Sequence, residues 1–217
     1  MPESRPGALP MLAGVAFVVL AVAAFVTGGE TPSFDDSAQK VVSFYDDNKA
    51  REYVASFLIA YATLFGAIFV GHVHAVLRWA SPRRGWTTVA AIGGGGLVAG
   101  WLVAAGVHLA VTEAVDKDLP DDAVRALNAL DTDIWPALAV PLFVVVLATA
   151  AALLAADVVP RWLAWVGLAL GILGFTPAAF FVFLLCGVWV LVFSVLAYLR
   201  LSAAEDDRPP PVAAAPA

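Results

Sequence analysis

The chain has 217 residues, of which 61% are hydrophobic and only 14% charged, with a formal net charge of −6 at pH 7. Soluble domains contain about 45–50% apolar and about 25% charged residues, so this composition excludes a soluble globular protein and indicates an integral membrane protein. The negative charge excludes a nucleic-acid partner, which would require clustered Lys and Arg to replace the counterions of phosphate groups.

Uncharged stretches of about 20 residues are long enough to cross a hydrocarbon core of roughly 30 Å as helices. The first such stretch follows Arg5 and reads either as a retained anchor or as a cleaved signal sequence; its length and the lack of a clean A-x-A site favour the anchor. The last uncharged stretch, 162–199, would be about 57 Å long as one helix. Because Gly174 to Pro177 interrupt it, we expect a hairpin of two helices, the alternative being a single crossing that moves the tail across the membrane.

The fold class predicted is therefore an all-α, polytopic membrane helix bundle. Within residues 1–201 we expect six transmembrane helices, at about 8–28, 53–77, 87–112, 135–156, 162–176 and 178–199.

Positive residues set the predicted orientation. Arg78, Arg83 and Arg84 lie in one short loop and Arg161 in another, so both loops are placed in the cytoplasm. Both chain ends are then cytoplasmic, and the acidic loops 29–52 and 113–134 lie outside. The Pro- and Ala-rich segment 202–217 is predicted to be a disordered cytoplasmic tail.

Both outer loops contain a short amphipathic pattern. Ser33 and Asp36 resemble a capping box, and a helical stripe follows; Pro120 and two aspartates open a second short helix. We expect both segments to cover helix ends. The alternative, a cation site in the second loop, lacks the spacing of an EF-hand. The two stripes are Phe34, Ala38, Val41 and Tyr45, and Val124, Leu127 and Leu130; the candidate cation ligands are Asp116, Asp118, Asp121 and Asp122.

The three histidines do not form a metal or haem site within one chain. His72 and His74 are two residues apart, which on a helix directs them to nearly opposite sides. His108 is expected roughly 20 Å from His72 along the membrane normal. No cofactor is predicted, although a haem between His72 and a histidine of a second subunit stays open.

The better candidate for a functional site is a polar pocket near the outer helix ends. His108 lies one turn from Thr112, and Glu113 and Asp133 flank neighbouring helix ends. We expect these four side chains to gather there. No catalytic motif accompanies them, so an enzyme is not expected; one would have to use Tyr, His108 and the acids of the loops.

Glycines in the third predicted helix form a small-residue face. Gly96, Gly100 and Ala104 recur at four-residue spacing, which lets another helix approach closely. Pro136 and Pro141 predict a kink in the next helix, and the pair of helices forms either a gate or an irregular interface.

Four segments resemble a family of uncharacterised six-helix bacterial membrane proteins that carries a domain-of-unknown-function label. They are "VVSFYDDNKAREYVASF", "AVLRWA", "ALNALDTDIWPA" and "VPRWLAWVGLALGIL". The resemblance implies a six-helix fold and no activity or site residues.

Two functions are consistent with these features. The first is a non-enzymatic component of the cell membrane that associates through the Gly96 and Gly100 face, with a second copy or with another membrane protein. The alternative is a small facilitative transporter or channel for an uncharged or amphipathic solute, which enters near His108 and Glu113.

Overall fold

The computed structural model describes residues 6–33 and 35–206, and these residues contain helices and loops but no strand. Five of the helical segments are long and apolar enough to cross a membrane. This confirms the all-helical membrane class. The elements are η1 (Leu9–Leu12), α1 (Ala13–Gly28), α2 (Ala38–Ala80), α3 (Arg84–Asp116), α4 (Asp121–Asp133), α5 (Trp135–Leu153), α6 (Arg161–Leu173) and α7 (Ala179–Asp206).

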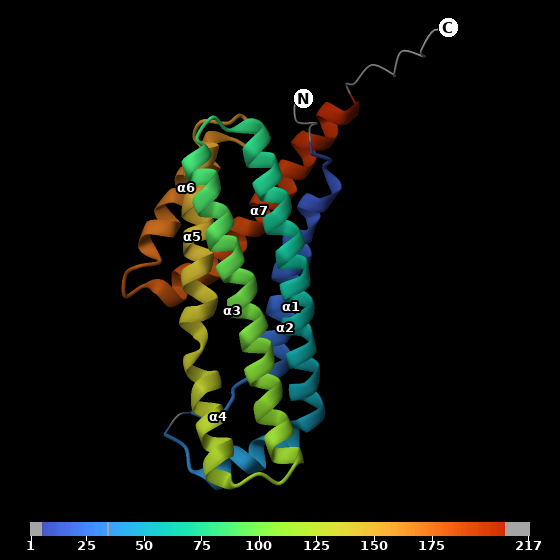
Figure 1. Ribbon diagram of the computed structural model, residues 1–217, viewed down its shortest axis with the longest axis vertical. Helices are drawn as coiled ribbons and strands as arrows, with labels where there is room; N and C mark the ends of the chain where they lie inside the picture. The colour runs from blue at the N-terminus through green and yellow to red at the C-terminus, as the bar shows by residue number, and fades with distance from the viewer. Residues whose placement is uncertain (1–5, 34, 207–217) are drawn as a thin grey trace, which may run out of the picture.

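Helices α1, α2, α3 and α5 run up and down alternately along the length of the molecule (Figure 1). We call the end that carries α4 and the loop between α1 and α2 the α4 end, and the other the opposite end. Helices α6 and α7 form a hairpin whose turn lies partway along the bundle, and α7 then returns to the opposite end, where α1 begins (Figure 1).

The largest difference from the sequence prediction is in α2. We expected a short outer helix and a separate span, but residues 38–80 form one continuous helix of about 65 Å. No Gly or Pro interrupts the chain between these two parts. The helix also begins later than the capping pattern suggested, because the Ser37 side chain accepts a hydrogen bond from the Lys40 N–H. Ser33 and Asp36 instead close the preceding turn, and Phe34 lies outside the described residues.

The predicted helix after Pro120 is confirmed as α4, with a different buried stripe. Val124 and Asn128 are buried, whereas Leu130 is 51% exposed. The start of α2 and the end of α3 pack against α4 around a small apolar cluster of their own, composed of Val41, Tyr45, Val111, Ala114 and Val124. This cluster anchors the start of α2 and the end of α3 beside α4.

The small-residue face of α3 packs against α5 of the same chain. A Cβ atom on Gly100 would clash with the carbonyl oxygen of Ala137, and one on Gly96 would lie 3.4 Å from Pro141 Cβ. Pro141 has no N–H, so it removes the helical donor that the Ala137 carbonyl would otherwise have. Pro136 lies in the first turn of α5, where a missing N–H costs nothing.

The predicted hairpin of a short and a longer helix corresponds to α6 and α7. α6 has 13 residues, about 20 Å, which is shorter than a hydrocarbon core. α7 continues through Asp206, into the segment predicted as a tail. The rest of that segment, 207–217, and Arg5 lie outside the described residues.

Candidate ligand-binding site

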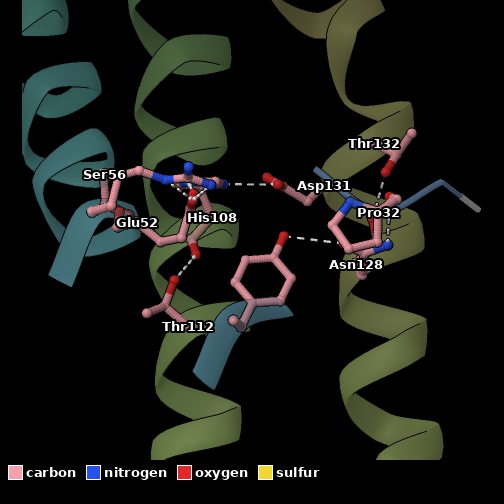
Figure 2. Close-up of polar contacts among 10 residues, drawn as sticks. Pro32, Glu52, Ser56, His108, Thr112, Asn128, Asp131 and Thr132 are labelled. Carbon is pink, nitrogen blue, oxygen red and sulfur yellow. Dashed lines mark hydrogen bonds and ion pairs between the residues drawn. The ribbon is translucent and has the colours of Figure 1, made fainter. Parts of the chain in front are cut away.

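Three ionisable side chains from three helices meet inside the α4 end of the bundle. His108 of α3 lies between Glu52 of α2 and Asp131 of α4, with Nδ1 2.8 Å from Asp131 Oδ2 and Nε2 3.1 Å from Glu52 Oε2 (Figure 2). The Glu52 side chain is fully buried, and the other two are 9% and 12% exposed. The cluster is therefore part of the protein interior.

The geometry of the Glu52, His108 and Asp131 cluster determines how many protons these three groups hold. A neutral imidazole has one N–H and can donate only one hydrogen bond. Two ring nitrogens within hydrogen-bond distance of two carboxyl groups thus require either an imidazolium between two carboxylates or a neutral ring with one protonated carboxyl group. In both cases the three groups together hold two protons and carry one negative charge.

Arg51 balances that charge. Its Nε and Nη2 atoms donate to Glu52 Oε1 at 3.1 and 3.0 Å, and its guanidinium lies 5.4 Å from the ring centroid of Phe44. The four ionisable groups are then neutral overall. A buried charge cluster is tolerated when its members are paired in this way, and breaking one pair leaves an expensive unpaired charge.

A second set of buried hydrogen bonds fixes α4 beside the cluster. Tyr45 Oη donates to Asn128 Oδ1 at 3.0 Å, and Asn128 Nδ2 donates to the carbonyl of Pro32 at 3.1 Å (Figure 2). Because Asn128 is one turn from Asp131, these bonds hold the Asp131 carboxylate toward His108.

The structure separates the four residues that the sequence grouped as a pocket. His108 and Thr112 are buried, and the Thr112 hydroxyl donates to the His108 carbonyl at 3.2 Å. Glu113 instead accepts from Lys117 Nζ at 2.5 Å on the exposed end of α3, a hydrogen bond that raises the pKa of Lys117 above its usual value. Asp133 is also exposed. Only His108 and Thr112 therefore belong to the buried cluster.

Sequence reasoning missed Glu52 and Asp131 because it placed helix boundaries at the last charged residue. The spacing of residues along each helix nevertheless indicates that both side chains face inward. Glu52 follows Tyr45 by seven residues on the stripe that includes Val41, and Asp131 follows Val124 by seven residues on the inner stripe of α4. Extending each apolar stripe by two helical turns, to include these charged residues, would have placed both carboxylates in the interior of the bundle.

A cavity of about 240 Å³ adjoins the cluster. His108, Asp131 and Thr132 line its polar side, and side chains of α1, α2, α3 and α5 form an otherwise mostly apolar wall. The apolar lining includes Ala24, Phe25, Ala55, Ile59, Trp101, Ala104, Trp135 and Leu138. The cavity is thus apolar along most of its wall and polar at the α4 end.

Trp101 adds one unused donor to this wall. The side chain is 2% exposed, and its Nε1 atom has no hydrogen-bond partner among the described residues. The other deeply buried tryptophan, Trp189, donates to the Leu163 carbonyl at 2.9 Å. A buried donor without a protein partner is costly, so an acceptor atom placed beside the Trp101 indole would stabilise it.

The remaining sequence candidates lie elsewhere. His74 lines a separate pocket at the opposite end with Arg78, Arg84 and two threonines. Asp116, one of the candidate cation ligands, forms an ion pair with Lys49. Within residues 6–33 and 35–206, no group of three or more His, Cys, Asp or Glu side chains is arranged to hold a metal ion.

Comparison of the chain with models of known protein families, with curated proteins and with solved structures found no match. The site must therefore be interpreted from its own geometry.

Proposed function

We propose that this protein is a small facilitative transporter of the cell membrane that binds an amphipathic solute in the cavity beside His108. The observation that carries the proposal is the cavity itself. It combines a mostly apolar wall with one polar end, and the wall includes Trp101, whose buried N–H group has no partner among the described residues. Cavities of this composition are the usual form of small-molecule sites, in which apolar contact supplies affinity and a few polar groups fix orientation.

The proposed topology keeps both chain ends in the cytoplasm. The arginines of the loop between α2 and α3 lie at the opposite end, which supports a cytoplasmic position for that end. The α4 end, with the cavity, then faces outward. In this arrangement α6 and α7 enter from the cytoplasmic side and return to it, so the six predicted spans include one that is short.

Helix association is less well supported as the main function. The Gly96 and Gly100 face is filled by α5, so a partner helix could use it only by displacing α5. Catalysis is also less well supported, because both nitrogens of His108 are engaged by carboxylates and no lone pair remains for a general base.

Ala104 offers a direct test, since it is 4% exposed and lines the cavity. Ala104→Phe places a ring in the cavity, whereas Ala99→Phe adds the same ring to an exposed position on the same helix. Wild-type protein extracted in polymer discs should carry a small amphipathic molecule that mass spectrometry identifies. Proteoliposomes should then transport that molecule.

We expect Ala104→Phe to lower both recovery and flux by about tenfold or more, equivalent to about 1.4 kcal/mol, and Ala99→Phe to leave both unchanged. Thermal unfolding of the two variants would show whether each is folded. Equal loss in both variants, or a wild-type protein that carries no such molecule, would contradict the proposed function.

A further inference from the structure

A second cavity of about 160 Å³ lies next to the first, along the central part of α1. The two cavities share Phe25 and Trp101 in their walls. The Trp101 ring makes edge contacts with Phe17 and Phe25, at centroid distances of 5.0 and 6.2 Å, so it forms part of the wall between the two cavities. The second cavity is lined mainly by α1 and α7, and its walls include Phe17, Val18, Ala21, Val22, Leu142, Phe183, Leu184, Gly187, Val188 and Leu191.

This second cavity opens on the side of the molecule that faces lipid. Val22, Leu184 and Val188 line it and are 55%, 54% and 55% exposed. The segment Leu9–Gly28 of η1 and α1 is about 30 Å long, which matches a hydrocarbon core. The first cavity lies at the Gly28 end of that segment, and the second lies beside its central residues. The polar end is therefore near the membrane interface and the apolar extension is within the hydrocarbon region.

Size also favours a ligand that occupies both spaces. The first cavity alone, about 240 Å³, is smaller than a usual ligand pocket of about 300–1,000 Å³. Together the volumes of about 240 and 160 Å³ give about 400 Å³, within that range. A ligand that occupies both cavities, with its polar part in the first and its apolar part in the second, would be one hydrocarbon chain with a small head group.

The polar end indicates the head group. Asp131 contacts His108 through Oδ2, and its carboxylate is an acceptor for donors in the cavity. Trp101, which lines both cavities, carries a buried N–H group that has no protein partner among the described residues. A head group with hydroxyl or amine donors, followed by a carbonyl acceptor, complements both groups. An anionic head group would face the Asp131 carboxylate and is disfavoured.

We propose that the solute is a single-chain amphiphile of the monoacylglycerol type, which reaches the site sideways from the membrane with its chain between α1 and α7. This inference rests on the proposed function and specifies its substrate class and route of access. It requires no opening of the α4 end, since the chain can slide in through the exposed side of the apolar cavity.

Gly187 is the position that tests the chain site. A Cβ atom there would meet only Val18 Cγ1 at 3.8 Å, so the first carbon of a larger side chain fits and the rest occupies the apolar cavity. Gly187→Leu should therefore fold and exclude the chain. Gly106→Leu is the matched control, because a Cβ atom on Gly106 has nothing within 4 Å.

The experiment uses a monoacylglycerol analogue with a photoactivatable group in its chain, added to the full-length protein in lipid discs. Peptide mapping should place the label on the α1 and α7 residues that line the apolar cavity. Excess unlabelled monoacylglycerol should compete, while the corresponding fatty acid, with its anionic head group, should compete less. Loss of contact for about two methylene groups is expected to lower labelling about tenfold in Gly187→Leu, with Gly106→Leu like the wild type.

Failure of this inference is distinguishable from failure of the proposed function. Labelling that is uniform over the lipid-facing surface, or unchanged in Gly187→Leu, would overturn the chain site. If Ala104→Phe still abolished recovery and flux of another solute, the proposed function would stand without this substrate. If neither Ala104→Phe nor Gly187→Leu changed any bound molecule, both proposals would fall.

Discussion

Helix α5 has two sides that differ in how they meet the rest of the bundle. Toward α3 it is packed so closely that Gly100 cannot gain a single carbon atom without meeting the Ala137 carbonyl. Toward α1 it borders space, because Leu138 lines the first cavity and Leu142 the second. The closely packed α3 side of α5 leaves no room for a ligand, whereas the cavities on its α1 side do.

A similar contrast separates the polar side chains at the two ends of the bundle. At the opposite end, polar side chains donate hydrogen bonds to backbone carbonyls of α5. Ser81 Oγ donates to the Ala152 carbonyl at 3.0 Å, and Arg83 Nη1 donates to the Ala151 carbonyl at 3.1 Å. At the α4 end, Glu52, His108 and Asp131 bond to one another beside a cavity. Backbone caps of the first kind stabilise a helix end. Side-chain clusters beside space more often serve binding.

The largest effect should follow removal of His108. His108→Ala leaves the Glu52 and Asp131 carboxylates buried without their shared partner, which should lower the free energy of unfolding by about 3–5 kcal/mol. Denaturant titration in mixed micelles measures this loss. The combined change of Glu52→Gln and Asp131→Asn in the His108→Ala background should recover much of it, because neutral amides cost less to bury. An unchanged stability in His108→Ala would show that the cluster is solvated.

The second largest loss of stability is expected at the close contact between α3 and α5. Gly100→Ala places a methyl group against the backbone of Ala137, and overpacking of this kind costs about 1–3 kcal/mol. Gly96→Ala is the matched control, since its methyl group would lie 3.4 Å from Pro141 Cβ and requires only a small adjustment. The same unfolding measurement should rank Gly100→Ala well below Gly96→Ala. Equal effects would mean that α3 and α5 are less closely packed than described.

The overall architecture could be predicted from the sequence because apolar length and interrupting residues are local signals. The uncharged runs gave the long helices, and Pro120 gave the start of α4. The full length of α2 could not be obtained in that way. Its first turns are charged on their outer side, and they remain helical because Val41 and Tyr45 pack against α3 and α4, which is a tertiary effect.

The candidate site was only half predictable for a related reason. His108 and Thr112 stand out because they are polar within an apolar run. Glu52 and Asp131 do not, because each lies among other charged residues next to a predicted helix boundary, and only the packing of three helices reveals that they point inward. The cavity is less predictable still, since it depends on how far α1 lies from α5.

Two tryptophans provide a sharper comparison with a smaller effect. Trp189→Phe removes a hydrogen bond to the Leu163 carbonyl and should cost about 1 kcal/mol of stability. Trp101→Phe removes an N–H group that has no protein partner among the described residues, so stability should hardly change. Retention of the bound solute should instead fall by up to about tenfold. If Trp101→Phe lost stability but kept the solute, the indole would be structural.

The smallest predicted effect is an increase in stability, whereas most of the substitutions above lower it. Gly95 lies between glycines whose added methyl groups would press on Val70 or Pro141, yet a Cβ atom on Gly95 has nothing within 4 Å. Alanine is preferred over glycine in a helix by about 0.5–1 kcal/mol, because glycine loses more backbone entropy when it becomes ordered. Gly95→Ala should therefore stabilise the protein by up to that amount in thermal unfolding, with no change in solute retention. A destabilised Gly95→Ala would show that another chain or a lipid packs against this face of α3, and would return attention to association through this helix.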